Sequence, residues 1–456
     1  MRRAIEDVIE RWATGDDLRP LLIRGARRVG KTYVVEQVGK RIAGDGFVKL
    51  DFQTDLQLIA SIFNGPTDDV DAIVARIADY KRVPLKKETA LLFFDEVQLC
   101  EPALNSLRFF SGSGWRVCAT GSQLGVATRK RTLPFPSGVC QVTMHPMSFE
   151  EFLWAFGEPQ MADALCEHAQ NLEPYSAHTE ALRYFRLYQV VGGMPAAVRA
   201  YLEGGSIDGA RVEQCEIDQT YTADMTDPEN GISGIAARKV WRSIPAQLLR
   251  SSTKKFKYSE VERGGRRAKL MEPLDWLEGA GIVSMNGLTG CLEAPLVPYD
   301  DMEGSFFKAY MADTGLMFYK LAVNPRLWLE ALEQGESFGS SDFRGALAEN
   351  SVMQALVSNG LKTYYWVPPS SWHATGELDF LLQTDSMEIV PIEVKSARNV
   401  RAKTLAAFME KSRAPFAYVV SENNFSREET SDGKEIRCMP LYAVHCIRGS
   451  FVRTEI

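Results

Sequence analysis

The stretch Gly25-Ala26-Arg27-Arg28-Val29-Gly30-Lys31-Thr32 decides how the first part of the chain folds. It matches every fixed position of the phosphate-binding pattern G-x-x-x-x-G-K-[ST]. The apolar run of residues 20–23 before it predicts a buried strand, and residues 32–41 after it have the periodicity of a helix. A strand, a glycine-rich loop and a helix are therefore expected, and together they would cradle phosphate groups. The competing interpretation is a glycine-rich turn without a ligand.

The spacing has a chemical reason. A triphosphate is held by backbone N–H groups that point into one concavity, and the two glycines keep side chains out of it. Lys31 would place its ammonium against the outer phosphates, and the Thr32 hydroxyl would be a ligand of Mg²⁺. The predicted nucleotide-binding residues are Gly25, Ala26, Arg27, Arg28, Val29, Gly30, Lys31, Thr32 and Tyr33.

A second stretch, residues 90–96, is an apolar run that ends in Asp95 and Glu96. This is typical of a buried parallel strand whose carboxyl end meets the nucleotide. Asp95 would hold the Mg²⁺ shell, and Glu96 would orient and deprotonate the attacking water; the alternative is an acidic turn after a core strand. Thr120 or Ser122, in the turn after another predicted strand, would sense the γ-phosphate, or would simply form that turn.

Length and composition limit the class of protein. The chain has 456 residues, which suggests about three domains. A net charge of -7 argues against extensive coating by nucleic acid. The eight cysteines form no C-x-x-C pair and are expected to be reduced, and no signal peptide or membrane-spanning run is evident. We expect a soluble, cytoplasmic protein that does not enter a membrane.

Residues 1 to about 160 resemble the AAA+ superfamily, with GARRVGKT, LLFFDE and ATGS in the positions of the phosphate loop, the acidic motif and sensor 1. More narrowly, the chain resembles a bacterial and archaeal family of predicted AAA-type ATPases that carry a C-terminal domain of uncharacterised function. The further motifs that match are residues 147–152 (MSFEEF), 192–195 (GGMP), 307–316 (FKAYMADTGL), 376–380 (GELDF) and 392–395 (IEVK).

The resemblance implies four regions: an ATPase core at 1–160, a helical lid at 161–232, a winged-helix-like domain at 233–335 and a nuclease-like domain at 336–456. The chain departs from the family at Val139, where a Gly-Arg pair is common and could supply an arginine finger. The nearby Arg129, Lys130 and Arg131 could supply that charge instead, or could be a solvated basic run. AAA-type sites usually borrow an arginine from a neighbouring subunit, so a homo-oligomer is expected.

Residues 240–283 predict three helices followed by a small β-ribbon, which is a winged-helix pattern. Basic residues gather before and at the start of the third helix, where a reading helix would face a DNA groove. Winged helices also dock proteins, so DNA and a protein partner both stay open. The basic residues are Lys254, Lys255, Lys257, Arg263, Arg266, Arg267 and Lys269.

The last region resembles the PD-(D/E)xK nuclease-like fold. By that resemblance Asp379 and Glu393 would bind Mg²⁺, Lys395 would be catalytic, and Glu349 would be the carboxylate from the preceding helix. Alternation along a strand also puts Glu377 on the face of Asp379. The other interpretation is a salt-bridged sheet face that cleaves nothing.

The predicted fold class is therefore α/β: a doubly wound, parallel-sheet P-loop NTPase core with a helical lid, a winged-helix segment and a C-terminal α/β restriction-endonuclease-like domain. The predicted activity is Mg²⁺-dependent ATP hydrolysis, with Lys31, Glu96 and Ser122 as catalytic residues. It would be coupled to a DNA- or partner-binding winged helix and to the nuclease-like domain. The alternative is a regulatory or scaffold protein that uses ATP as a conformational switch and has an inactive nuclease-like domain.

Overall fold

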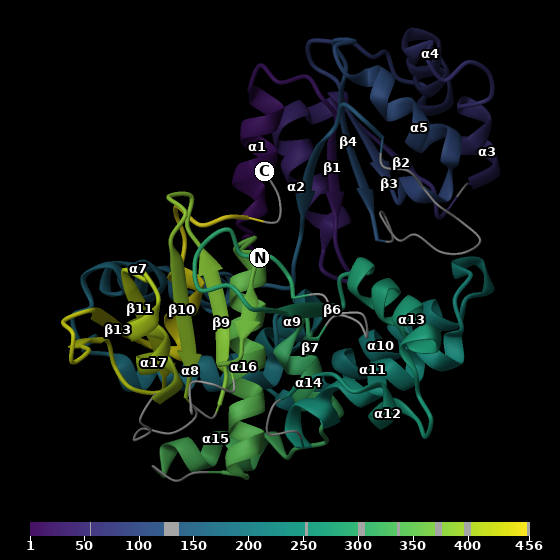
Figure 1. Ribbon diagram of the computed structural model, residues 1–456. Helices are drawn as coiled ribbons and strands as arrows, with labels where there is room; N and C mark the ends of the chain where they lie inside the picture. The colour runs from purple at the N-terminus through teal and green to yellow at the C-terminus, as the bar shows by residue number, and fades with distance from the viewer. Residues whose placement is uncertain are drawn as a thin grey trace. The chain divides into compact units, whose positions relative to one another are not determined.

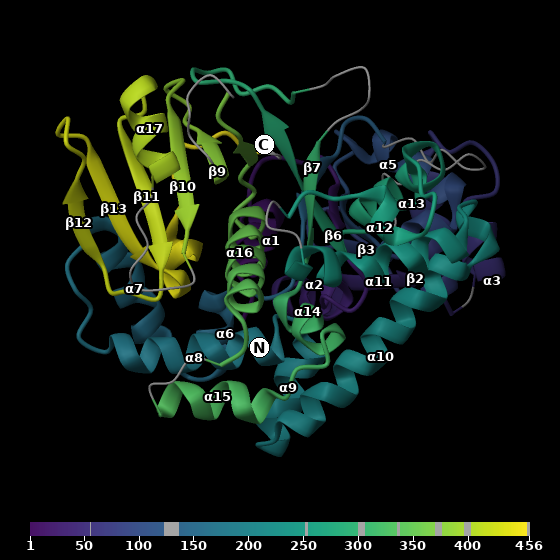
Figure 2. The same cartoon turned by 60° about the horizontal axis from the view of Figure 1, so that its bottom comes forward.

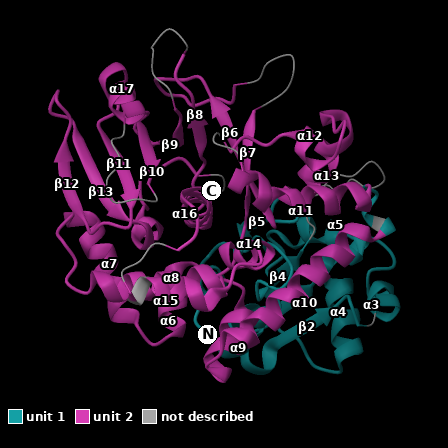
Figure 3. Ribbon diagram, turned by 90° about the horizontal axis from the view of Figure 1, so that it is seen from below, with its two compact units in different colours: residues 1–145, 228–232, 279–281 teal, residues 146–227, 233–278, 282–456 magenta. Residues whose placement is uncertain are grey.

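The structure is a computed structural model that describes residues 1–54, 56–122, 136–250, 254–299, 306–334, 338–369, 376–395 and 403–453. The chain forms two compact units (Figure 3). The first contains residues 1–145, 228–232 and 279–281, and the second contains residues 146–227, 233–278 and 282–456. None of the helices within the described ranges is long and apolar enough to cross a membrane.

The first unit is built on a five-stranded parallel sheet in the order β2-β3-β4-β1-β5. The helices α1 and α2 cover one face of this sheet, and α3, α4 and α5 cover the other (Figure 1). The elements are α1 (Ile5–Thr14), β1 (Leu21–Arg24), α2 (Lys31–Ala43), η1 (Gly44–Gly46), β2 (Phe47–Asp51), α3 (Leu56–Ile62), α4 (Val70–Lys81), β3 (Leu91–Asp95), η2 (Val97–Leu99), α5 (Glu101–Phe110), β4 (Arg116–Gly121), β5 (Cys140–Thr143) and η3 (Pro228–Asn230).

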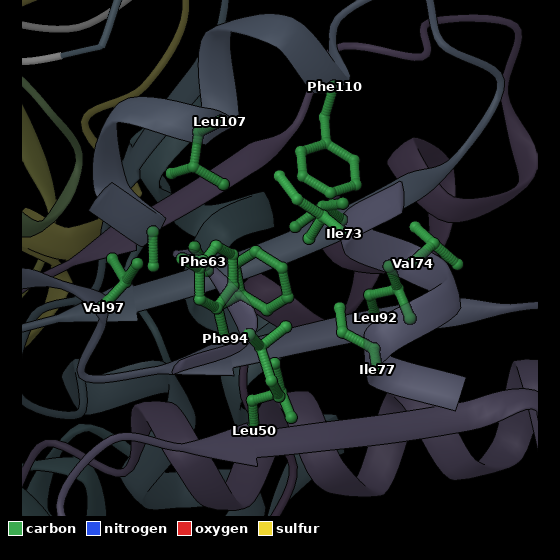
Figure 4. Close-up of a cluster of buried hydrophobic side chains, with 14 of the residues drawn as sticks. Leu50, Phe63, Ile73, Val74, Ile77, Leu92, Phe94, Val97, Leu107 and Phe110 are labelled. Carbon is green, nitrogen blue, oxygen red and sulfur yellow. The ribbon is translucent and has the colours of Figure 1, made fainter. Parts of the chain in front are cut away.

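Alternation along the strands explains how this sheet has two packed faces. Leu92 and Phe94 of β3 point into a cluster with side chains of α3, α4 and α5 and with Phe63, which follows α3 (Figure 4). All five residues of β3 are buried, as expected for a central strand of a parallel sheet. Asp95 lies at the carboxyl end of this buried strand.

The second unit begins with helices and then forms an eight-stranded mixed sheet in the order β12-β13-β11-β10-β9-β8-β6-β7. Figure 2 shows β12, β13, β11 and β10 side by side. The elements are α6 (Phe149–Ala155), α7 (Pro159–Asn171), α8 (His178–Val191), α9 (Pro195–Gly204), α10 (Ile207–Thr226), α11 (Gly234–Arg250), α12 (Tyr258–Val261), α13 (Arg267–Gly279), β6 (Val283–Thr289), β7 (Phe307–Met311), α14 (Thr314–Lys320), α15 (Pro325–Glu333), α16 (Ser341–Ser358), β8 (Tyr364–Trp366), β9 (Leu378–Gln383), β10 (Ile389–Val394), α17 (Lys403–Lys411), β11 (Phe416–Ser421), β12 (Ser426–Glu429), β13 (Glu435–Pro440) and η5 (Leu441–Cys446).

Helices cover both faces of the second sheet. The side chains of α17 pack with Tyr364 and Trp366 of β8 in one apolar cluster. Tyr365, between them, points to the opposite face, where Lys308 of β7 lies over its ring. Helix α16 contacts β6, β7 and β10 and brings Glu349 to Lys308 on that face. Polar groups from α16 are thereby buried against strands of the sheet.

Three segments that are far apart in sequence meet at one buried junction in the second unit. The backbone N–H of Met147 donates to Gly193 O at 2.7 Å, and the N–H of Gly193 donates to Asp313 Oδ2 at 2.6 Å. The other carboxylate oxygen of Asp313 caps α14 by accepting from the N–H of Leu316 at 2.8 Å. Gly192 has a φ of +79°, and a Cβ there would lie 2.4 Å from Asp313 Oδ1, so glycine is required. The MSFEEF, GGMP and FKAYMADTGL motifs all contribute to this junction.

The observed units differ from the four predicted regions in two places. Residues 146–160, predicted as the end of the ATPase core, group with the second unit, where Met147 bonds to Gly193. Helices α11 to α13 and strands β6 and β7 follow in the order expected of a winged helix, but the strands do not stand apart as a ribbon. Because β6 pairs in parallel with β8, the predicted boundary at residue 335 falls within one continuous sheet.

Candidate functional site

The loop between β1 and α2 has the backbone that the phosphate-binding pattern predicts. Gly25 has a φ of +144°, and a Cβ there would lie 2.1 Å from Met144 O. Gly30 has a φ of +96° and precedes the first residue of α2. Gly25 therefore has no room for a side chain, and the positive φ at Gly30 favours glycine. The loop leads directly into the N-terminus of a helix, which favours anions.

The side chain of Lys31 lies inside this loop. Its ammonium donates to Gly25 O and to Ala26 O, both at 2.9 Å. Burial lowers the pKa of Lys31, although the charges of Glu96 and Asp95 oppose that effect. Among the described residues this buried ammonium forms no ion pair, and its two hydrogen-bond partners are neutral carbonyls. The loop is thus built to gain from an anion bound beside Lys31.

Asp95 is the centre of a buried hydrogen-bond network at the end of β3. Its Oδ1 accepts from Thr32 Oγ1 at 2.9 Å and from Thr120 Oγ1 at 2.6 Å. Its Oδ2 lies 2.9 Å from Lys49 Nζ. Carboxylate and hydroxyl oxygens are the ligands that Mg²⁺ prefers, so the Thr32–Asp95 pair fits a Mg²⁺ site beside the phosphate loop.

Glu96 is held in a fixed position next to Asp95. Its φ is +57°, in the left-handed region that a non-glycine residue rarely adopts. Its Oε2 accepts from Ser122 Oγ at 2.8 Å and from Gln98 Nε2 at 2.6 Å, and its backbone N–H donates to Thr120 Oγ1 at 3.2 Å. Such strain is maintained where the surroundings over-determine the conformation, and it often marks a functional position.

Other residues that the sequence analysis named for this site lie on α2, within the loop and at position 139. Tyr33 is 56% exposed on α2. Arg28 has a φ of +68° within the loop, and Val139 is partly buried. Arg129, Lys130 and Arg131 lie outside the described residues.

Three residues that support the loop and the acidic pair were not found from the sequence. Lys49 of β2 binds Asp95, and Gln98 binds Glu96. Arg3 is 4% exposed and donates to Val29 O at 2.8 Å and to His145 O at 2.7 Å. Lys49 alternates with apolar residues in a predicted strand, so the sequence could have indicated that its side chain faces the acidic end of a neighbouring strand. No pattern in the sequence indicates the role of Arg3.

The acidic residues predicted in the C-terminal region also converge, but around a lysine. Lys308 is fully buried, and its ammonium lies 2.6 Å from Glu377 Oε1, 3.5 Å from Glu349 Oε2 and 3.5 Å from Asp379 Oδ1. Burial opposes ionisation of Lys308, yet its electrostatic interactions with Tyr310 and with these carboxylates outweigh burial and raise its pKa well above the usual range. Lys308 was not predicted, although it stands in the FKAYMADTGL motif. An internal cation therefore occupies the centre of the carboxylate group.

Other lysines accompany the same carboxylates. Lys254 pairs with Glu349, and Lys395 pairs with Glu393. Burial and the charge of Asp379 raise the pKa of Glu393 to about 8 despite Lys395. Burial and the charge of Glu349 likewise raise the pKa of Asp379. Glu349, Asp379, Glu393 and Lys395 therefore lie together in one ion network with Lys308 and Lys254.

The basic residues predicted for DNA contact are divided between two environments. Lys254 lies in the network just described, and Lys257 and Lys269 pair with Glu260 and Glu262. Three arginines at or before the start of α13 are exposed: Arg263, Arg266 and Arg267.

Three family models match parts of the chain, and one of them covers most of the first unit. Residues 17–153 match a family model described as an AAA domain. Two further models, each described as a domain of unknown function, match residues 182–327 (DUF8612) and 344–443 (DUF4143). The phosphate loop, Asp95 and Glu96 lie within the first of these matches.

Individual relatives are distant. The uncharacterized protein MJ1544 of Methanocaldococcus jannaschii is 26% identical over 133 residues, which are 29% of this chain and 27% of that protein. The Walker-type ATPase paby2304 of Pyrococcus abyssi has a TM-score of 0.38 at 14% identity and covers 70% of this chain and 95% of its own. A signal-transduction ATPase (STAND) with a tetratricopeptide-repeat sensor from Pyrococcus horikoshii has a TM-score of 0.27 at 14% identity, covering 78% of this chain and 51% of its own. Scores this low support no conclusion about residues or partners.

The family match and the loop geometry agree. The first unit contains a P-loop ATPase domain of the AAA type, and ATP binding and hydrolysis are the general activity of such domains.

Proposed function

We propose that the first unit binds ATP with Mg²⁺ and hydrolyses it, with the loop residues 25–33 around the phosphates. Lys31 supplies positive charge to the outer phosphates, and Thr32 and Asp95 supply the oxygen ligands for Mg²⁺. Glu96 orients the attacking water and accepts its proton, while Ser122 holds the Glu96 carboxylate in place. The observation that carries this proposal is the Thr32–Asp95–Thr120 network beside a glycine-shaped loop that contains a buried ammonium.

Two substitutions separate binding from hydrolysis. Lys31→Ala should weaken ATP binding, because phosphate charge loses its ammonium partner. Glu96→Gln should leave ATP bound and uncleaved, because only the proton acceptor is lost. Glu101→Gln is the matched control, since Glu101 is an exposed carboxylate five residues further along the chain. Normal turnover by Glu96→Gln would remove Glu96 from the role of base.

We further propose that hydrolysis requires a neighbouring subunit. The position at which the family commonly has an arginine is Val139 here. An arginine from another copy of the chain would then complete the site, and turnover per subunit should rise with protein concentration. The measurement is specific ATPase activity across a dilution series, together with mass by light scattering. Constant specific activity of a monomer would contradict the proposal.

For the second unit we propose recognition of a partner without cleavage, coupled to nucleotide state. Lys308 supports this alternative, because Mg²⁺ bound by Glu349, Asp379 and Glu393 would have to compete with an ammonium already among the carboxylates. The nuclease alternative requires that Mg²⁺ stabilise the wild-type protein without nucleotide, and that Asp379→Asn abolish the gain. It also requires Mg²⁺-dependent cleavage of DNA or RNA that is lost in Lys395→Ala while ATP turnover persists.

DNA is the partner suggested by the order of α11 to α13 and β6–β7, which suits a winged helix, and by three exposed arginines, Arg263, Arg266 and Arg267. Replacing the three by alanine should weaken binding to duplex DNA and reduce its dependence on salt. Fluorescence anisotropy with labelled duplex measures both quantities. Lys239→Ala is the control, because Lys239 is an exposed lysine that pairs with Glu262. Equal binding by the triple variant would favour a protein partner.

A further inference from the structure

Three side chains with nitrogen or sulfur donors converge at one point in the second unit. Cys166 lies on α7, and His445 and Cys446 lie at the end of η5. Within the described part of the chain they form the group of three whose donor atoms all lie within 4.8 Å of one another. The two sulfur atoms are 2.7 Å apart, and Cys446 Sγ is 3.3 Å from His445 Nε2.

The imidazole of His445 is oriented as a metal ligand would be. Its Nδ1 lies 2.8 Å from the carbonyl oxygen of Tyr442, which accepts the Nδ1 proton and leaves the Nε2 lone pair facing the sulfur of Cys446. The ring is 1% exposed and packs edge-on against Phe149 at 5.8 Å. Asn359, which follows the last residue of α16, holds the backbone in place by donating to His445 O at 2.9 Å. The ring therefore cannot flip without breaking its hydrogen bond to Tyr442 and its packing against Phe149.

The charges around the group are balanced before any cation is added. Glu150 of α6 is buried and pairs with Arg448, whose Nε also donates to His445 O at 3.1 Å. The thiolate, and not the thiol, is the form of cysteine that binds a metal, so both cysteines would release a proton on binding. With Glu150 neutralised by Arg448, two thiolates would be left to neutralise one divalent cation.

We propose that Cys166, His445 and Cys446 bind one zinc ion, which ties α7 to the end of η5. Two thiolates and one imidazole are a ligand set that favours zinc among the common divalent metals, with a fourth position for water. Zinc–sulfur bonds of about 2.3 Å in a tetrahedral site place the two sulfurs about 3.8 Å apart, so the sulfurs separate by roughly 1 Å on binding.

A disulfide between the two cysteines would use the same sulfurs but does not account for His445. A disulfide has no S–H to donate, so it would leave the buried Nε2 without a partner, which is costly. Zinc satisfies all three donors at once. The site does not involve the phosphate loop, and its test does not depend on ATP hydrolysis.

The test uses the full chain, expressed with zinc and purified under reducing conditions. Elemental analysis should find about one zinc per chain in the wild type and little in Cys166→Ser or Cys446→Ser. Cys215→Ser is the matched control, since Cys215 is a partly buried free cysteine on α10, and it should retain zinc. After removal of zinc with a chelator, cobalt should produce a thiolate charge-transfer band that Cys166→Ser lacks, and two further thiols should react with a thiol reagent.

Three results would overturn the proposal. The first is folded wild-type protein that carries no zinc and shows no rise in melting temperature on zinc addition. The second is a folded Cys166→Ser variant that retains as much zinc as the wild type. The third is freshly purified protein in which the two cysteines form a disulfide, which would make them a redox pair.

Discussion

Replacing Lys308 by methionine would test whether an ammonium holds the carboxylates of the second unit together. Methionine keeps most of the volume and removes the charge, leaving Glu349, Glu377 and Asp379 without the group that lies within 3.5 Å of each. Removing one partner from a buried ion pair typically costs about 3–5 kcal/mol, because the remaining charge is uncompensated. Lys254 and Lys395 remain and limit the loss, so we expect a value towards the lower end of that range.

The loss should depend on pH with a definite sign. Without Lys308 the carboxylates have pKa values raised above those of the unfolded chain, so the folded state binds more protons. The free energy of unfolding then falls as pH rises through the interval between the unfolded and folded pKa values. The deficit of Lys308→Met relative to wild type should therefore be small near pH 5 and larger at pH 8.

Urea unfolding followed by tryptophan fluorescence is a suitable assay, because Trp241, Trp328 and Trp366 are buried in this unit. Adding Glu377→Gln to Lys308→Met removes one charge of each sign and should recover part of the loss, with a coupling energy of about 0.5–3 kcal/mol. Lys239→Met, which breaks an exposed pair, should change the midpoint little.

The same variant should acquire a new property. With the ammonium gone, Mg²⁺ can approach three carboxylates, so Mg²⁺ should stabilise Lys308→Met and not the wild type. Two results would contradict this reasoning: equal free energies of unfolding for Lys308→Met and the wild type at pH 8, or equal stabilisation of both by Mg²⁺. Either would mean that the ammonium of Lys308 does not hold the carboxylates together.

Three further results are expected. Arg3→Ala should raise the dissociation constant for ATP about tenfold, because Arg3 supports the phosphate loop through its hydrogen bond to Val29 O. Arg2→Ala, at an exposed arginine, should leave the dissociation constant unchanged. Equilibrium titration with a fluorescent ATP analogue measures both. Gly192→Ala should lower the melting temperature of the protein far more than Gly157→Ala, because both have positive φ but a Cβ at 157 meets nothing within 4 Å. Glu393→Gln should stabilise the protein more at pH 8 than at pH 5. A carboxyl group with a folded pKa of about 8 destabilises the folded state increasingly as the pH rises above the pKa of the same group in the unfolded chain. Denaturation at the two pH values checks the sign.

The sequence was sufficient for the phosphate loop and the acidic pair, because both are local. Gly25, Gly30 and Lys31 lie in one short pattern, and Asp95 ends an apolar run whose burial follows from composition alone. The partners of these residues come from elsewhere in the chain. Lys49 reaches Asp95 because β2 and β3 pair in register, and that register is a property of the folded sheet.

Domain organisation was harder to predict, because strands of one sheet can be separated by long insertions. Helix α16 and its flanking segments lie between β7 and β8, and the pattern after residue 335 therefore resembled a new domain. The pairing of β6 with β8 is a tertiary contact that no local periodicity encodes. Lys308 was missed for the same reason, since a lysine in a strand is ordinarily expected at the surface.

The motifs that carry the family resemblance in the second unit have different physical meanings. Met147 and Gly193 meet through a backbone hydrogen bond, and the Asp313 side chain accepts from the Gly193 N–H and caps a helix. The glycines at this junction leave no room for a Cβ. Lys308, in the same motif as Asp313, instead belongs to the carboxylate network. A substitution at Gly192 or Asp313 that abolishes activity would thus report first on folding, whereas a change at Lys308 matched by Glu377→Gln can report on the network itself. Variants should accordingly be compared at equal folded fraction before a motif in this unit is assigned a role in binding or chemistry.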